Sequence, residues 1–584
     1  MHKKLFVLFL LLFSFVLPAQ PPLTFNSVAS RAPAGPASAF VPEPGAVLNH
    51  TQVMFEYPGV KNAADYRLVI EELVPVVKTG KPDTLKKIVI EQVDRTPATL
   101  VSGLEFGKSY SWYFIAFDPK GNPIAQSPAK RFSILPLPPA DPAKNRVRVL
   151  KKSKDNTGLF TLDYMHAIID RNGNPVWCLR PVPGKISESD LIRDIRVTPQ
   201  GTITMLSTQH IYELNTAGKI LWTGPDDGKV SGTNREYYHH DFKRLPNGNY
   251  MVLGNEIIIK KVPGGTDTVR VNFGTIIEYT FWGKPVWVWR SKDYFTNDSE
   301  IFNSRNEQGK TQASLHLNAF SVDEKGEYVY AGFRDLNRIL KIEKATGQVA
   351  GDYGGKLFWH QHDANILPDG NIALFNNDSV ADPKITSSAM IIAPPARPGE
   401  QPKVAWKFDC KMDEQNDGKS IKMGSMDLLP NGNYLINMGG VNRVVEVSKD
   451  KKIAWDILVE AWSEKEKKWI ESKQYRAHYA SSLYPCYFTA FATTETWSDE
   501  TKMLQVTINN EGTEADQYKI MYRSKGDGSP PVQADFVFSL GAGKSGLANV
   551  NLLKLPPKGS ALELKITSVT NPEFSRTIIV PYQK

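Results

Sequence analysis

A short unit in which a turn is followed closely by tryptophan recurs along the middle of the chain. The tryptophans are Trp177, Trp222, Trp287, Trp406 and Trp455, and a sixth copy at residues 347–351 lacks one. A glycine turn recurs between them, at residues 197–206, 244–253, 322–331, 366–375 and 428–437. Repeats of ~40 to 60 residues with strand-like alternation predict a radial array, because one sheet cannot bury both faces without neighbours. The series predicts an all-β fold built on a six-bladed β-propeller.

The repeats also place individual side chains. Eight residues before the turn glycine, successive copies carry Arg193, His240 and His362, and each is followed by aspartate. The copy at residues 322–331 has a longer turn, and His316 lies ten residues before its glycine. Innermost propeller strands line the central channel, so these basic side chains are predicted to converge at one end of it. The aspartates, one residue further along each strand, are predicted to point away from the channel.

At 584 residues the chain is too long for one ordinary domain, and its 41% hydrophobic content suffices for several cores. Strand-like runs separated by turns precede and follow the repeats, which predicts a β-sandwich on each side. The residues Leu104, Gly107, Tyr110, Trp112, Ala116 and Asp118 resemble a fibronectin type III pattern. The predicted divisions are a signal peptide (1–19), a linker (20–45), a fibronectin type III-like sandwich (46–136), the propeller (146–485) and a C-terminal sandwich (486–584).

The first residues have the layout of a secretory signal peptide. Lys3 and Lys4 precede an apolar run over residues 5–17, and Ala19 follows it. The run is too short for a membrane-spanning helix, so stable membrane insertion is not expected. The pattern predicts export, to a periplasm, with cleavage after Ala19.

Charge and cysteine content exclude some classes of function. The formal charge is +8, but lysine and arginine are scattered among acids, which gives nucleic-acid binding little support. The cysteines Cys178, Cys410 and Cys486 are odd in number, so a disulfide framework is not expected to organise the fold.

Three kinds of chemistry suit the predicted cluster of His240, His316 and His362. Three imidazoles can hold a catalytic zinc ion, act without metal as nucleophile and proton donor, or fill the channel as inert side chains. Arg193 and Arg334 are predicted at the same channel end. Guanidinium groups repel a metal cation and suit an oxyanion, which favours a sulfate or phosphate group.

Several segments resemble the bacterial arylsulfate sulfotransferases, a family that needs no nucleotide sulfate donor. Residues 358–378, FWHQHDANILPDGNIALFNND, resemble the nucleophile segment of that family. Residues 316–320, the segment around Arg334, and residues 237–242 resemble its other active-site strands, in the same order along the chain. The resemblance covers most of the predicted propeller, and the family fold agrees with six blades.

The resemblance implies a role for each site residue. His362 would attack sulfur and become a transient sulfohistidine, while His316, Asn318 and Arg334 would hold the sulfuryl oxygens. His240, or as the alternative His239, would protonate the leaving phenolate and later deprotonate the acceptor phenol.

Two further residues are expected near the substrate, and two segments depart from the family pattern. Arg193 lies at the same channel end by repeat register, and Arg476 resembles a family position near the site. Asp363 stands where the family pattern leads us to expect threonine, and residues 335–337 read Asp-Leu-Asn where histidine and glutamine are expected. These departures bear on substrate orientation more than on sulfur chemistry.

The implied reaction is a ping-pong transfer from an aryl sulfate donor to a phenolic acceptor, with no cofactor and no metal. A phenol has a pKa of about 10, so its anion leaves more readily than an alkoxide. Two other classes stay open: a metal-dependent hydrolase or lactonase using the three histidines, and a non-catalytic exported binding propeller. Hydrolysis, with water as acceptor, is a further alternative. The flanking sandwiches have no assigned role, and a homodimer is one arrangement they allow.

Overall fold

The computed structural model describes most of the chain after the predicted signal peptide and linker. The described residues are 40–78, 81–138, 144–303, 312–377, 385–395, 397, 400–412, 417–492, 496–526, 528 and 530–582. Within them nearly every element is a strand, and the α-helices are two short ones, α1 (Ser291–Tyr294) and α2 (Asp298–Asn303). The all-β prediction is confirmed. The predicted signal peptide lies outside the described residues.

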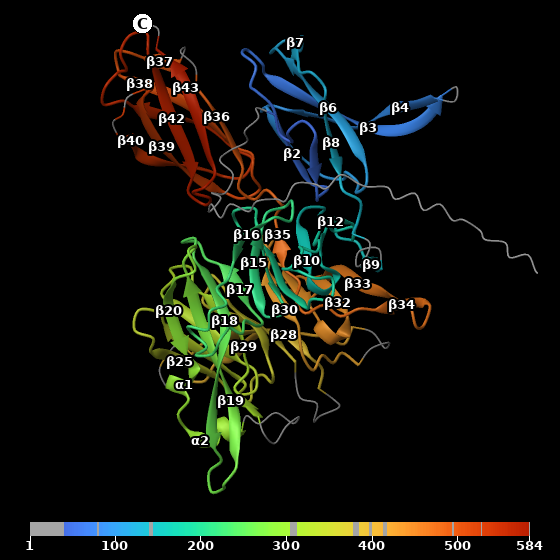
Figure 1. Ribbon diagram of the computed structural model, residues 1–584, viewed down its shortest axis with the longest axis vertical. Coiled ribbons are helices and arrows are strands. Elements are labelled where there is room, and N and C mark those ends of the chain that lie inside the picture. Colours follow the sequence, from blue (N-terminus) through green and yellow to red (C-terminus); the bar gives the residue numbers. More distant parts are fainter. Residues whose placement is uncertain are drawn as a thin grey trace, which may run out of the picture.

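In the described ranges the repeats fold into six sheets, each built on four strands, and we call residues 145–480 the array (Figure 1). The first three sheets are β35 (Tyr479–Ala480), β10 (Leu159–Leu162), β11 (Ala167–Ile169) and β12 (Pro175–Cys178); β13 (Ile192–Val197), β14 (Ile203–Ser207), β15 (His210–Leu214) and β16 (Ile220–Thr223); and β17 (Phe242–Arg244), β18 (Tyr250–Lys261), β19 (Thr268–Tyr279) and β20 (Pro285–Arg290), with β21 (Gln312–Ser314) beside β19.

Three more sheets follow within the described residues. They are β22 (Leu317–Val322), β23 (Tyr328–Phe333), β24 (Arg338–Glu343) and β25 (Val349–Gly354); β26 (His362–Ile366), β27 (Ile372–Asn376), β28 (Ser388–Ala393) and β29 (Lys403–Asp409); and β30 (Ser425–Leu428), β31 (Tyr434–Asn437), β32 (Arg443–Val447), β33 (Ile453–Ser463) and β34 (Lys468–Glu471), with β9 (Asn145–Lys151) beside β33. Because β35 comes from the end of the array and pairs with β10 from its beginning, the first sheet joins the two ends of the repeat region.

The repeated tryptophans bind five of the six sheets to the next sheet in the array. Each indole Nε1 donates to a backbone carbonyl in the turn before the fourth strand of the following sheet, at 2.8 to 2.9 Å. The pairs are Trp177 to Thr216, Trp222 to Phe281, Trp287 to Lys344, Trp406 to Lys449, and Trp455 back to Arg171. The last bond runs from the sixth sheet back to the first, so these bonds join every adjacent pair of the six sheets except the fourth and fifth, where the repeat lacks tryptophan. The tryptophan motif therefore supplies hydrogen bonds between sheets as well as apolar packing.

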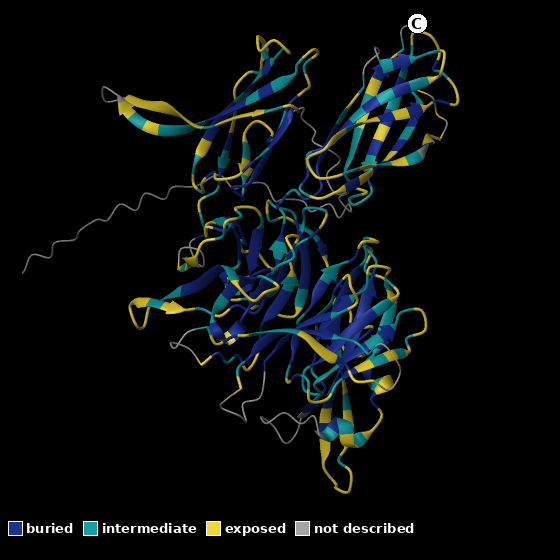
Figure 2. Cartoon of the chain, turned by 180° about the vertical axis from the view of Figure 1, so that it is seen from behind, coloured by how far each residue is buried: buried dark blue, intermediate teal, exposed yellow. Residues whose placement is uncertain are grey.

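The aspartates of the second repeat join the innermost strands. The carboxylates of Asp194, Asp241 and Asp363 each accept a backbone N–H from the next sheet, at 2.8, 3.0 and 2.9 Å. The same carboxylates surround the guanidinium of Arg476, whose Nη1 lies 3.0, 3.1 and 3.5 Å from them. We call Asp194, Asp241, Asp363 and Arg476 the aspartate layer. Its four side chains are fully buried. Figure 2 shows that the interior of the array is mostly buried.

A sandwich lies on each side of the array in sequence. The N-terminal one has β1 (Ala46–Leu48), β8 (Lys130–Ile134), β6 (Ser109–Phe117), β3 (Asp65–Lys78) and β4 (Lys81–Asp94) in one sheet, with β7 (Pro123–Gln126) beside β6, and β2 (Val53–Glu56) with β5 (Ala98–Val101) in the other. Its core contains Phe55, Trp112 and Phe114. The fibronectin type III likeness stays a prediction.

The C-terminal sandwich has two four-stranded sheets. One contains β36 (Phe488–Phe491), β38 (Met503–Asn510), β37 (Trp497–Ser498) and β41 (Ser545–Asn551); the other contains β40 (Val532–Leu540), β39 (Asp516–Ser524), β42 (Ala561–Ser568) and β43 (Ser575–Pro581). Figure 1 shows the two sandwiches next to each other above the array. They are joined by an ion pair of 2.7 Å between Arg576 Nη2 and Glu56 Oε2. No helix among the described residues is long and apolar enough to cross a membrane.

Candidate active site

The histidines singled out by the repeats lie at the beginnings of innermost strands, where the strands are irregular. The pairing register shifts after Arg193, after Leu317 and after His362. His240 and His316 have positive φ angles of 63° and 53°. Such bulges and left-handed residues re-aim side chains and are common beside active sites. Here they turn the histidines toward one another while the following aspartates point to Arg476.

The hydrogen bonds of His362 determine which ring nitrogen carries its proton. Nδ1 lies 2.6 Å from Asn377 Oδ1 and 3.1 Å from the His360 carbonyl. The amide nitrogen of Asn377 donates to the carbonyls of Ser420 and Met423, at 2.9 and 2.7 Å, so its oxygen must face His362. Nδ1 therefore carries the proton and Nε2 carries the lone pair. The partner nearest to Nε2 is the Met423 N–H, at a long 3.4 Å.

The surroundings of His362 keep its ring neutral. Burial, reinforced by the positive charge of Arg334, lowers the pKa of His362 to about 3. A neutral imidazole with its lone pair on Nε2 is a good nucleophile. The predicted nucleophile therefore has the protonation state that attack on sulfur requires.

His239, His240 and His316 form a chain of hydrogen bonds. His239 Nε2 lies 3.2 Å from the Gly254 carbonyl and 2.9 Å from Asn255 Oδ1, so it donates there. Its Nδ1 is then the acceptor for the Nδ1–H of His240, at 2.7 Å. His240 Nε2 in turn lies 3.3 Å from His316 Nε2. Burial lowers the pKa of His239 to about 4 and that of His240 well below its ordinary value, so both rings are neutral.

Arg334 lies beside this chain and is held by its neighbour in the sequence. Its Nη1 contacts Asp335 Oδ1 at 2.5 Å, and its Nη2 lies 3.5 Å from His360 Nδ1. The backbone N–H of Arg334 donates to the His316 carbonyl at 2.9 Å, which joins the two segments. The side chains of Arg334 and His316 are 18% and 28% exposed, so this part of the cluster can be reached by a substrate.

Tyr475 completes the cluster, and the repeat pattern did not single it out. Its ring centroid lies 6.0 Å from that of His240 and 6.4 Å from that of His362, and the Arg193 guanidinium lies 5.3 Å above it. Its buried hydroxyl has no hydrogen-bond partner in the described structure, and burial raises its pKa. The only sequence signal was its position beside Arg476. Asn377 was missed too, although a signal existed: it lies seven residues after the turn glycine Gly370, as Asn255 does after Gly248.

Two of the predicted substrate-binding residues have their polar groups engaged elsewhere. The side-chain nitrogen of Asn318 donates to the Gln361 carbonyl at 2.8 Å, although its oxygen is unpaired. Arg476 is completely buried in the aspartate layer, and its Nη2 donates to the Asn318 carbonyl at 3.1 Å. In this structure both residues hold strands together beneath the histidines, while Arg193, His239, His240, His316, Arg334 and His362 lie in the cluster itself.

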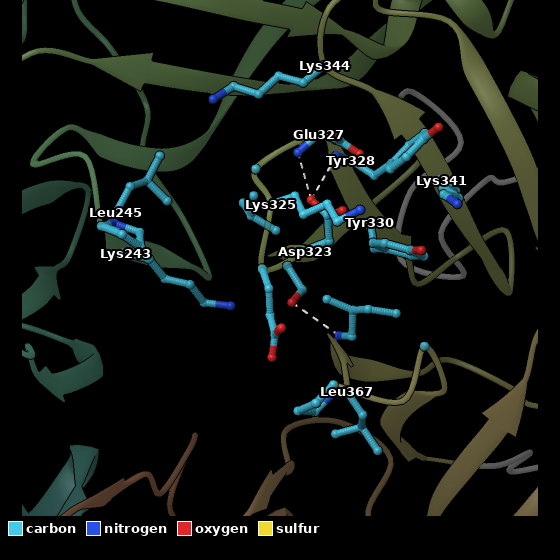
Figure 3. Close-up of a pocket in the computed structure, with 18 of the residues that line it drawn as sticks. Lys243, Leu245, Asp323, Lys325, Glu327, Tyr328, Tyr330, Lys341, Lys344 and Leu367 are labelled. Atoms are coloured by element: carbon cyan, nitrogen blue, oxygen red, sulfur yellow. Dashed lines mark hydrogen bonds between the residues drawn. The ribbon is translucent and has the colours of Figure 1, made fainter. Parts of the chain in front are cut away.

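A cavity of about 820 Å³ lies away from the histidines. Figure 3 shows Lys243, Asp323, Tyr328, Tyr330 and Lys341 around it, near the repeated glycine turns. None of the residues that line it is a histidine. The cavity is thus distinct from the candidate site. In the described part of the chain, no group of three or more His, Cys, Asp or Glu side chains is arranged to hold a metal ion.

Comparison with known proteins adds a family match for part of the array. Residues 146–354 match the model of the family described as Arylsulfotransferase (ASST). The matched segment contains His239, His240, His316 and Arg334 and ends before His362. No curated protein matches the chain.

Several solved structures are similar at low identity. A protein of unknown function from Bacteroides caccae is 13% identical over 58% of this chain and 100% of its own, with a TM-score of 0.34. A streptogramin B lyase structure is 12% identical over 54% of this chain and 88% of its own, at 0.30. The β-propeller domain of Cps50 (Swd1) from Myceliophteria thermophila is 10% identical over 58% and 85%, at 0.23. Among the comparisons, the family match is the one that bears on activity, and it supports an arylsulfotransferase.

Proposed function

We propose that the protein transfers a sulfuryl group from an aryl sulfate to a phenol by a ping-pong mechanism through a sulfohistidine at His362. The observation that carries the proposal is the state of His362: it is neutral, protonated at Nδ1, and leaves its Nε2 lone pair in a cluster of cationic side chains. The family match over residues 146–354 supports the same class of reaction.

In the first half-reaction, His362 Nε2 would attack sulfur while the bond from sulfur to the phenolic oxygen breaks. Charge develops on the sulfuryl oxygens and on the leaving oxygen, much as in phosphoryl transfer. Positioned cations lower such a barrier because they need little reorganisation during the reaction. Arg334 and Arg193 are the permanent cations available, and their charges act on His362 and Tyr475 respectively.

In the second half-reaction, an acceptor phenol would take the sulfuryl group from His362. The phenol must lose its proton as its oxygen attacks sulfur, and the bond from Nε2 to sulfur breaks. His240 and His316, 3.3 Å apart, are the pair that would exchange this proton with the substrates. Asn377 would keep the same ring nitrogen of His362 available in every cycle.

We also propose that the reaction takes place after export, because the first residues resemble a signal peptide. A periplasmic enzyme without a nucleotide donor would draw on aryl sulfates that reach that compartment. The flanking sandwiches leave homodimer formation as a further proposal, to be tested by the mass of the mature protein in solution.

The direct test uses the purified mature chain with 4-nitrophenyl sulfate, with and without phenol and with and without EDTA. We expect nitrophenolate release that depends on phenol and is insensitive to EDTA, together with a sulfuryl adduct in the intact mass. His362→Ala should lose both signals. His166→Ala, at a histidine outside the cluster, is the matched control and should keep both.

Other results would point to the other functions. Release that EDTA abolishes would indicate a metal-dependent hydrolase, and rapid release without phenol would indicate transfer to water. If the protein yields neither nitrophenolate nor adduct, the proposal is wrong and a binding function takes its place.

A further inference from the structure

Asp335 stands where the family resemblance led us to expect histidine, and it contacts two members of the cluster. Its Oδ1 lies 2.5 Å from Arg334 Nη1, and its Oδ2 lies 3.5 Å from His316 Nδ1. Its side chain is only 9% exposed. A buried carboxylate between an arginine and an imidazole favours the charged form of that imidazole.

We propose that Asp335 is a positioning residue that holds His316 in its doubly protonated form, so that His316, rather than His240, stores the proton given to the leaving phenolate. The inference rests on the proposed function and deepens it by assigning the acid of the first half-reaction.

The direction of each hydrogen bond in the histidine chain leads to this assignment. His239 can donate only from Nε2, so it accepts the Nδ1–H of His240. His240 is neutral and has used its proton, so its Nε2 is a lone pair. The His316 Nε2, 3.3 Å away, must therefore be the donor in that contact. His316 Nδ1 faces the carboxylate of Asp335, so that nitrogen also carries a proton.

The charged and titratable groups around His316 come from several elements. His239 and His240 precede β17, Arg334 and Asp335 follow β23, and His362 begins β26. The positive charge of Arg334 disfavours an imidazolium at His316. Within the described structure, Asp335 is the one carboxylate in contact with the His316 ring. Burial opposes ionisation of Asp335, but the hydrogen bonds and charges of His316 and Arg334 hold its pKa below the ordinary value.

The proton balance of the reaction follows from this arrangement. In the first half-reaction the bond between His362 Nε2 and sulfur forms, the bond from sulfur to the aryl oxygen breaks, and the proton shared along the His316–His240 contact moves to that oxygen. In the second, the acceptor phenol returns a proton to the same pair as its oxygen bonds to sulfur. Each full cycle leaves the pair as it began, with the charge on His316 beside Asp335.

The kinetic test compares two donors with Asp335→Asn, Asp335→Glu and the control Asp352→Asn. Asp352 pairs with Arg338 in the same sheet, away from the histidines. For Asp335→Asn we expect kcat with phenyl sulfate to fall about 100-fold and kcat with 4-nitrophenyl sulfate to fall less than ~10-fold, because nitrophenolate leaves without a proton. Asp335→Glu should restore most of the loss, and Asp352→Asn should change neither. Equal losses with both donors would overturn the proposal, since they would mean that Asp335 acts only by holding Arg334.

A second readout does not depend on activity. NMR of the histidine ring nitrogens, with the His316 signals identified from His316→Gln, should show both nitrogens protonated at neutral pH in the parent and only one in Asp335→Asn. A singly protonated His316 in the parent would overturn the assignment. If the parent forms no sulfohistidine, the proposed function fails, and the protonation assignment is then judged by the NMR result alone.

Discussion

Two residues that are neighbours in the chain can have opposite electrostatic surroundings in this protein. His362 and His240 are neutral, and in each ring Nε2 carries a lone pair rather than a proton. The residues directly after them, Asp363 and Asp241, are buried carboxylates bound to Arg476 and to backbone N–H groups. The histidine cluster thus rests directly on the aspartate layer. The comparison indicates that the repeats supply reactive groups at one position and the bonds that hold those groups in place at the next.

The largest effect is expected when the aspartate layer loses its central cation. Arg476→Met would leave the carboxylates of Asp194, Asp241 and Asp363 without their common partner, and should destabilise the fold by about 3–5 kcal/mol. The measurement is the free energy of unfolding in urea. Arg338→Met is the control, because its pair with Asp352 is partly exposed and should contribute about 0–1 kcal/mol. Similar losses of unfolding free energy for the two variants would show that the aspartate layer stabilises the fold no more than a partly exposed ion pair does.

A smaller effect is expected when the partner of the nucleophile is removed. Asn377→Leu would free the Nδ1–H of His362 and allow the ring to rotate or change tautomer, so the rate of adduct formation should fall about 10- to 100-fold. The fold should be affected less than by Arg476→Met. Adduct formation is followed by intact mass after rapid mixing with 4-nitrophenyl sulfate. An unchanged rate would mean that the hydrogen bond does not determine which nitrogen reacts.

The smallest effect concerns pH and separates the two kinds of histidine. His478 lies between Asp194 and Asp427, at 3.1 and 3.0 Å, and although burial opposes its charge, these partners raise its pKa to about 9. A raised histidine pKa stabilises the folded state fully below the ordinary value of 6.5, and the stabilisation is lost as the pH rises toward 9.

The difference in unfolding free energy between the parent and His478→Gln should therefore shrink as pH rises from 6.5 to about 9. The lowered pKa of His362 acts in the opposite sense, since protonation of the unfolded chain favours unfolding as pH falls from 6.5 toward 3. Urea unfolding at pH values between about 3 and about 9 measures the pH dependence that each histidine contributes. A difference for His478→Gln that does not vary with pH would contradict the paired, charged state of that histidine.

Much of the fold and part of the candidate site could be predicted from local patterns. Repeat spacing placed His240, His316 and His362 at the same position of their strands, and the structure brings these segments together. Tyr475 does not occupy a repeated position, so the pattern could not predict it. Asn377 repeats the position of Asn255, seven residues after the turn glycine, but spacing alone does not show that either amide contacts a histidine. The pattern also could not show that Arg476 is enclosed by three aspartates from three sheets, since that contact depends on where the segment before β35 lies relative to the innermost strands.

By itself, the sequence determined the all-β class, the repeated sheets and the set of basic residues that share one end of the array, because strand alternation and turn glycines are local properties. Only the tertiary structure decided which imidazole nitrogens carry protons. Those protons depend on burial and on hydrogen-bond partners such as Asn377, Asn255 and Asp335, which other strands and loops of the array supply. A protonation state is a property of the assembled surroundings, so it follows from distances in space rather than from spacing along the chain.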